Sequence, residues 1–301
     1  MMTLEQRTDG MLLGAFVGDA LALGPHWVYD RKQIMEKLGR VTGYREPATQ
    51  YHPGKRAGDY THLGDQMLVL HRSLAASGGK LEPVAFMKSW LAFWNDPATK
   101  SYQDKATKAV WGNVEQGAAL TEAASASTEF AGPVRGFPVL AAGLRRGDDE
   151  AALANALVTQ TSLTHRSPEV MDVAVFTARL VARLKAGQDS HTALEEVIEV
   201  SSAFVRDNSR RAEAQDIAGL STGEAIESLG QSCDSEDALP ASVLLLRRHG
   251  GSFEEALVEN VMAGGDSAAR GIFVGGVLGF VHGEDGIPKA WRDGLRQRPV
   301  G

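Results

Sequence analysis

Two aspartates share one context in this sequence, directly after a glycine and directly before a helix-forming segment. They are Asp65, which follows Gly64, and Asp266, which follows Gly265. The free N–H groups and partial positive charge of a helix N-terminus keep a carboxylate ionised, although such an aspartate often only caps its helix. Because both segments have the apolar pattern of core helices, we expect both carboxylates at the rim of a helical bundle, where helix ends commonly line a polar site.

Three histidines lie near these aspartates or beside another predicted helix start. His26 lies in the segment GPHWVYD, His62 precedes the first of the two aspartates by three residues, and His165 precedes a predicted helix. Ser167, which is followed by proline, is the expected cap of that helix. Imidazole gains and loses a proton near neutral pH, so each ring is a candidate proton carrier. A structural or merely exposed histidine is the alternative in each case.

Two further side chains flank the same positions. Arg270 follows Asp266 by four residues, which is the spacing of a helical ion pair; the alternative is a guanidinium that grips a phosphate or carboxylate. Trp27, beside His26, offers a stacking face or packs as a core aromatic. The sequence contains no GxxxxGK[ST] run, no dinucleotide-binding fingerprint after a strand and no GxSxG elbow.

Two stripes of small residues predict how the first and last helices pack. Residues of each stripe recur every fourth position and therefore share one helix face. They are Gly10, Gly14, Gly18 and Ala22 in the first, and Ser267, Gly271, Gly275, Gly279 and Gly283 in the second. An interior glycine costs ~1 kcal/mol of helix stability relative to alanine, so we expect the two stripes to pack together and to bring Asp19 near Asp266. A membrane dimer face is the alternative, but the uncharged run 271–281 is shorter than the ~20 residues of a span.

Apolar residues recur with helical spacing through most of the chain. The clearest segments are residues 84–94, 151–163, 170–184, 194–204, 241–246 and 253–262. Alternating β-branched runs, which are typical of strands, are scarce. With a typical helix length of ~11 residues, the sequence predicts an all-α protein of about a dozen helices. The absence of a long flexible linker predicts a single domain over residues 1–301.

The longest irregular stretch, residues 42–59, directly precedes the segment YTHLGD. A long loop within a compact domain is commonly either functional or disordered. Four of its side chains could close over an anionic or aromatic ligand, namely Tyr44, Tyr51, His52 and Arg56. A solvated surface loop is the alternative.

The composition is that of an ordinary globular protein and limits the partners. Apolar residues make up 43% and charged residues 23% of 301 positions, and a net charge of −7 with no basic tail argues against nucleic acid. Cys233 is the sole cysteine, so this chain can form neither an internal disulfide nor a sulfur metal site, which suits a reducing cytoplasm. Asp19 interrupts the apolar N-terminal stretch and no basic region precedes it, so we expect a core helix and a cytoplasmic protein rather than a secreted or membrane-bound one.

Four motifs in this order resemble those of the ADP-ribosylglycohydrolase family, which includes the dinitrogenase-reductase-activating glycohydrolase. They are GAFVGDALALG, THLGDQMLVL, LTHRSPEV, and GGDSAARGIFVGGVLG followed by Ile287, Pro288 and Trp291. The resemblance covers nearly the full length and implies an all-α, orthogonal multi-helix bundle. It also implies cleavage of the bond between the anomeric carbon of ribose and arginine, serine or a related group, with two Mg²⁺ or Mn²⁺ ions in a cleft between helices.

The sequence departs from the family pattern at most of the expected metal ligands. Leu63 and Gly64 stand where the second motif has carboxylates, and Ala268 and Ala269 replace an aspartate and a threonine of the last motif. His26 lies near the position of a glutamate that some members use in catalysis. Hard cations need several oxygen ligands, so a two-metal site of the usual kind is not expected.

The remaining residues predict a divergent hydrolase that cleaves an N- or O-glycosidic bond of a ribosylated small molecule or an ADP-ribosylated protein. Such a reaction passes through an oxocarbenium-like state that needs a stabilising charge and help for the leaving group or water. We expect catalysis by Asp65, Asp266, His26 and His165. We expect substrate binding by His62, Arg270, Ser267, Trp27 and Asp19. At most one Mg²⁺ would bind, through Asp65, Asp266 and Thr61.

Two alternatives remain open at this point. The first is a catalytically silent module on the same fold that binds ADP-ribose or a related nucleotide sugar. The second is a metal-free enzyme for another small N-glycoside, built around His26 and Asp65. The sequence gives no indication of the oligomeric state.

Overall fold

A computed structural model describes residues 2–299, and the chain in that range consists of α-helices without a β-strand. The helices are α1 (Leu4–Ala22), α2 (Arg31–Leu38), α3 (His62–Ala76), α4 (Pro83–Asn95), α5 (Lys105–Glu115), α6 (Ala131–Val134), α7 (Phe137–Arg146), α8 (Glu150–Ser162), α9 (Pro168–Lys185), α10 (Ser190–Glu199), α11 (Ala203–Ile217), α12 (Thr222–Leu229), α13 (Ser235–His249), α14 (Phe253–Met262), α15 (Ser267–His282), the 3-10 helix η1 (Glu284–Gly286) and α16 (Lys289–Gly294). The predicted all-α fold is confirmed. The described chain has more helices than the dozen expected, because several of them, such as the four-residue α6, are much shorter than average.

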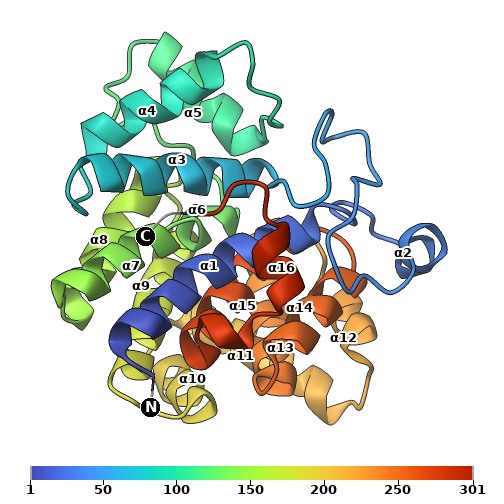
Figure 1. The fold of residues 1–301 in the computed structure, drawn as a ribbon. Coiled ribbons are helices and arrows are strands. Elements are labelled where there is room, and N and C mark those ends of the chain that lie inside the picture. The colour runs from blue at the N-terminus through green and yellow to red at the C-terminus, as the bar shows by residue number, and fades with distance from the viewer. Residues whose placement is uncertain (1, 300–301) are drawn as a thin grey trace.

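An antiparallel pair of helices, α1 and α15, lies side by side in the middle of the molecule (Figure 1). Gly14 faces Gly275 across this pair, and Gly18 faces Gly271. A Cβ atom on Gly271 would lie only 2.6 Å from the carbonyl oxygen of Gly18, which is closer than two such atoms can approach. The predicted contact between the two glycine stripes is therefore confirmed.

The direction of the pair decides which residues meet. Because α1 and α15 run in opposite directions, the turn that follows α1 lies beside the first residues of α15. Within residues 2–299, none of the helices combines the length and the apolar character that crossing a bilayer requires.

Two apolar clusters support this arrangement. The larger one surrounds the central pair and includes Phe137 of α7, Val173 of α9 and Leu244 of α13. The smaller one lies among α3, α4 and α5, which form a separate layer beside the central pair (Figure 1), and it includes Trp90 and Val110. Helix ends from both parts of the molecule meet at the cleft described below.

One predicted helix is interrupted in the structure. The apolar pattern predicted a continuous helix over residues 194–204, but α10 ends at Glu199 and α11 begins at Ala203. The physical reason is a local cap, because the Ser202 side chain accepts a hydrogen bond from the N–H of Val205. The predicted cap at Ser167, in contrast, is confirmed at the start of α9.

Candidate active site

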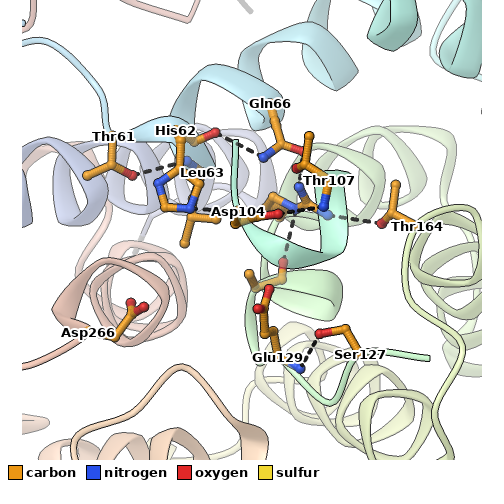
Figure 2. A network of polar contacts seen from close by, with 12 residues as sticks. Thr61, His62, Leu63, Gln66, Asp104, Thr107, Ser127, Glu129, Thr164 and Asp266 are labelled. Carbon is orange, nitrogen blue, oxygen red and sulfur yellow. Dashed lines mark hydrogen bonds and ion pairs between the residues drawn. The ribbon is translucent and has the colours of Figure 1, made fainter. Parts of the chain in front are cut away.

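A cleft of about 550 Å³ is lined by residues from the N-terminal ends of several helices. Four of its wall residues carry carboxylates, namely Asp104 before α5, Glu129 near the start of α6, Asp234 before α13 and Asp266 before α15. Trp27, Tyr29 and Tyr102 supply aromatic wall. Figure 2 shows Asp104, Glu129 and Asp266 around the same space, although they come from different helix ends.

Asp266 occupies the N-cap position of α15 but makes no capping hydrogen bond. Its Oδ1 lies 3.2 Å from Nε2 of His26, and its Oδ2 accepts a hydrogen bond of 2.9 Å from the indole N–H of Trp27. Burial alone would raise the pKa of Asp266, but its interactions with His26 and Trp27 lower it to about 2. The carboxylate is therefore ionised at neutral pH, and its charge is held by two rings rather than by its own helix.

The turn after α1 brings those two rings into place. Trp27 N–H donates to the carbonyl of Gly265, and Gly265 N–H donates to the carbonyl of Val28, so the turn is hydrogen-bonded to the Gly-Gly segment before α15. Trp27 itself has a φ of 64°, a left-handed conformation that costs energy for a side chain of this size. Such strain is found mainly at functional sites, and here it directs the indole N–H to Asp266.

A second histidine extends the contacts of Asp266. An ionised carboxylate only accepts hydrogen bonds, so Nε2 of His26 carries the proton of that bond. Burial lowers the pKa of His26 and lowers that of His52 to about 2, so both rings are neutral at pH 7. Nδ1 of His26 then accepts the 2.9 Å hydrogen bond from Nε2 of His52, whose own Nδ1 has no hydrogen-bond partner. The three side chains form a continuous chain of hydrogen bonds, which strengthen one another in a buried site.

His62 and Asp104 form another acid–imidazole pair on the cleft wall, with Nε2 and Oδ2 3.3 Å apart. Burial would raise the pKa of Asp104, but its interaction with His62 holds that pKa well below its usual value. Asp104 also caps α5, since its Oδ1 accepts a 2.6 Å hydrogen bond from the N–H of Thr107. Nδ1 of His62 is buried and has no hydrogen-bond partner.

His165 lies behind the cleft and approaches it through Glu129. Its Nε2 is 3.7 Å from Oε2 of Glu129 and has no hydrogen-bond partner, while its Nδ1 is 2.9 Å from the hydroxyl of Thr164. The guanidinium of Arg135 donates to Thr164 and to Gln66, and burial lowers the pKa of His165. A neutral His165 next to Glu129 fits a proton acceptor or donor better than a fixed charge.

Asp65 is engaged outside the lining of the cleft. The ammonium group of Lys55 lies 2.7 and 2.6 Å from its two carboxylate oxygens, and both side chains are largely buried. Asp65 was expected to stand at a helix start, and it lies in the first turn of α3, whose N-cap is Thr61. The positive charge that accompanies this carboxylate is thus supplied by a lysine from the loop 42–59.

Asp19 and Thr61 bind one another. Asp19 Oδ2 accepts from the N–H of Thr61 at 2.8 Å, and its Oδ1 accepts from the Thr61 hydroxyl at 2.5 Å and from the N–H of Gly64 at 3.1 Å. A side chain on Gly64 would collide with this carboxylate, which explains a glycine at that position. Asp19 was expected near Asp266, but the two carboxylates have different partners. Asp19 binds the start of α3, whereas Asp266 binds the turn after α1.

Two predicted substrate-binding residues lie beneath the cleft wall. Arg270 is fully buried and donates to Oδ1 of Asn260 and to the carbonyl of Gly264, so in the described chain it makes neither the helical ion pair with Asp266 nor part of the cleft lining. Burial lowers its pKa to about 10, which leaves it charged at pH 7. Ser267 is also buried, and its hydroxyl has no hydrogen-bond partner.

The donors predicted for one Mg²⁺ do not form a site. Lys55 neutralises both oxygens of Asp65, the oxygens of Asp266 accept hydrogen bonds, and the Thr61 hydroxyl donates to Asp19. Within residues 2–299 no group of three or more His, Cys, Asp or Glu side chains is placed to hold a metal ion. Mg²⁺ needs several free oxygen ligands. Because an ammonium group already binds both oxygens of Asp65, these residues do not fit the ion.

Sequence reasoning missed several residues of the cleft. They are Asp104, Glu129, Asp234 and Tyr102. Asp104 and Asp234 each precede a helix-forming segment, so the capping rule that singled out Asp266 could also have found these two. Glu129 lies in a segment with no comparable pattern, and only the fold brings it to the wall.

The fold and the cleft define an all-α protein with a site made of carboxylates at helix ends. The family model of ADP-ribosylglycohydrolase matches residues 1–300, so the chain belongs to the ADP-ribosylglycohydrolase family. An uncharacterised protein of Archaeoglobus fulgidus is 26% identical over 300 residues, which cover 98% of this chain and 93% of that relative. A solved structure described as an ADP-ribosylglycohydrolase-related protein complex has a TM-score of 0.73 at 20% identity, over 97% of this chain and 93% of that one, and shows the shared fold.

Proposed function

We propose that this chain hydrolyses the N- or O-glycosidic bond of a ribosylated substrate in the cleft beside Asp266. The observation that carries the proposal is a buried, ionised carboxylate whose two oxygens are held by His26 and Trp27 instead of capping its own helix. A carboxylate with no capping role, on the wall of a cleft, is suited to stabilise a developing positive charge. Membership of the ADP-ribosylglycohydrolase family supports a ribosyl substrate.

The reaction divides between the two sides of the cleft. Cleavage of the bond at the anomeric carbon places positive charge on the ribose ring. The negative charges of Asp266 and Asp104 stabilise that positive charge. Glu129, with His165 behind it, is placed to take a proton from the attacking water or give one to the leaving group. His26 holds Asp266 in position through a hydrogen bond, and His52 in turn is hydrogen-bonded to His26. No step is assigned to a metal ion, because the donors do not fit one.

The substitution Asp266→Asn tests the proposal, because it removes the charge and keeps the size of the side chain. We expect turnover to fall by about 10²- to 10³-fold with unchanged helical content by circular dichroism. The assay measures ribosyl product released from ADP-ribosylated arginine and serine peptides and from small N-ribosides, with and without Mg²⁺.

Asp285→Asn is the matched control, since Asp285 is almost fully exposed in η1, beyond the far end of α15. It should keep wild-type turnover. Equal turnover of the wild type and the Asp266→Asn protein would end the assignment.

A silent binding module is the second candidate, and the Lys55–Asp65 pair is the observation in its favour. In this pair the ammonium group of a lysine binds both oxygens of the carboxylate that was predicted to bind a metal ion. The module would bind ADP-ribose, measured by calorimetry, and release no product from any of the substrates above. Product release from any of them that Asp266→Asn abolishes would exclude the module.

A further inference from the structure

Each helix start at the cleft carries one of the protein's own carboxylates. Asp104, Asp234 and Asp266 occupy the N-cap positions of α5, α13 and α15, and Glu129 lies directly before the N-cap of α6. Helix N-termini are the usual binding sites for phosphate groups in proteins. Here a ligand phosphate would meet a carboxylate at each of them.

The neighbouring start of α3 is filled in the same way. The N–H groups of Thr61 and Gly64, which could otherwise bind an anion, donate to the carboxylate of Asp19. Each described helix start around the cleft therefore has a carboxylate beside the position that a ligand anion would take, although Asp234 and Asp266 make no capping hydrogen bond.

One cation, Lys105, is exposed on the cleft wall, whereas the two buried arginines of this region are out of reach of a phosphate. Among the described residues that line the cleft, Lys105 is the one with a Lys or Arg side chain, and it is exposed. Arg135 and Arg270 lie behind the wall, buried, and donate to protein oxygens of Thr164, Asn260 and Gly264 among others. They reduce the cost of the buried carboxylates but do not line the space that a ligand enters.

The rest of the wall suits a flat, positively charged group. Trp27, Tyr29 and Tyr102 line the cleft together with the four carboxylates, and aromatic rings attract cations. Nδ1 of His62, a residue that is 2% exposed and lines the cleft, has no partner and is a polar group left for a ligand. Cys233 on the same wall reports the negative potential, because burial and the charges of Asp266, Glu129 and Asp234 raise the pKa of its thiol.

We infer that the cleft takes a phosphate-free N-riboside whose leaving group is a flat cation, such as a ribosylated pyridinium or guanidinium, in preference to ADP-ribosyl compounds. This inference rests on the proposed glycosidic hydrolysis and names its substrate class. The bond between C1′ and the nitrogen breaks, and its electron pair stays with the nitrogen, which becomes neutral. Water bonds to C1′ and releases one proton. A leaving group that is already cationic departs without a general acid, which suits a cleft lined by carboxylates.

Nicotinamide riboside, its 5′-phosphate and ADP-ribose test the inference, because the first is a cationic N-riboside and the other two carry phosphate. Binding to the Asp266→Asn protein is measured by calorimetry, and release of nicotinamide by the wild type is measured by chromatography. We expect nicotinamide riboside to bind about tenfold or more tightly than either phosphate-bearing probe. Equal or tighter binding of the phosphate-bearing probes would overturn the inference.

The two readouts keep the inference and the proposed function apart. Preferential binding of nicotinamide riboside with no release of nicotinamide, and no product from the ribosylated peptides, would support the charge selection and overturn the hydrolase. Hydrolysis of ADP-ribosylated arginine in the absence of any action on nicotinamide riboside would support the hydrolase and overturn the inference.

A variant at the rim adds a graded test. Asp234 is exposed and accepts a hydrogen bond from the Thr128 hydroxyl, which the amide oxygen of Asp234→Asn also accepts. We expect this change to weaken binding of nicotinamide riboside about two- to fivefold and to leave or improve the binding of its 5′-phosphate. Asp285→Asn should change neither. A loss of affinity for both probes by the same factor would contradict the selection by charge.

Discussion

Lys55 and Asp65 form an ion pair that is largely removed from water next to the cleft. Removing one member of a buried pair leaves the other charge without a partner, which is far more costly than replacing both. Lys55→Met should therefore lower the free energy of unfolding by about 3–5 kcal/mol, measured by urea denaturation. The double variant Lys55→Met with Asp65→Asn should recover most of that loss.

Lys289→Met is the matched control for this pair. Lys289 also contacts an aspartate, Asp293, but both side chains are mostly exposed, so its removal should change stability by less than about 0.5 kcal/mol. An equal urea midpoint for the Lys55→Met and Lys289→Met proteins would show that the buried pair contributes nothing special to the fold.

At the residue scale, Asp266 lines the cleft and Asp65 does not, although the sequence placed both in the same context. Both aspartates follow a glycine at the start of a helix, so local sequence cannot tell them apart. The difference arises from the partners: Asp65 meets a lysine from the preceding loop, while Asp266 meets a histidine and a tryptophan from the other end of the chain. Glu129 was missed because it belongs to no motif, and the fold alone brings it to the cleft, whereas Asp104 carries a capping signal that was not used.

At the scale of elements, the contact between α1 and α15 is the feature on which the site depends. This contact holds the turn that carries His26 and Trp27 against the start of α15. A methyl group on Gly275 would overlap the carbonyl oxygen of Gly14, which is backbone and cannot rotate away. Gly275→Ala should therefore destabilise the protein by about 3 kcal/mol or more and reduce soluble expression.

Gly112 offers the control, since it lies within helix α5 with no atom near the position of an added Cβ. Gly112→Ala should raise stability by about 0.5–1 kcal/mol, the usual difference in helix propensity. Thermal unfolding of the two variants beside the wild type measures both effects. A Gly275→Ala protein as stable as Gly112→Ala would disprove close contact between the two backbones.

At the scale of the whole molecule, burial of neutral histidines ties stability to pH. The pKa of His52 falls to about 2, and burial also lowers the pKa of His26 and of His165. An unfolded histidine has a pKa near ~6.5, so below that pH the unfolded chain binds more protons and the folded state loses stability as the pH falls. Asp19 opposes this trend, because burial raises its pKa to about 6 and the folded state keeps its proton between about pH 4 and 6.

The substitution His52→Gln isolates one of these protons. Between pH 6 and 5 the free energy of unfolding should fall less steeply with pH in this variant than in the wild type. The difference between the two slopes should be about 1.4 kcal/mol per pH unit, the value for one proton. Urea denaturation at a series of pH values gives the two slopes. The exposed His191 serves for comparison, and His191→Gln should keep the wild-type slope. Identical slopes for all three proteins would mean that His52 is not held neutral in the fold.

The sequence by itself determined the local structure and the central contact of this protein. Helical periodicity and caps are short-range properties, so α14 was predicted over the residues it occupies, and α4, α8 and α9 to within a residue or two at each end. A glycine stripe is informative because bare helix faces are costly unless a backbone covers them. The partner of α1 could therefore be predicted from the far end of the chain.

Only the tertiary structure decided which side chain each carboxylate meets. Asp19 went to the start of α3 and Asp266 to the turn after α1, because the antiparallel direction of α1 and α15 and the path of the loop before α3 set those distances. Neither direction nor path is encoded in any local pattern of residues. The chemistry of the cleft follows from these long-range contacts, since a carboxylate acts as a cap, a partner of lysine or a free charge according to the neighbour that packing gives it.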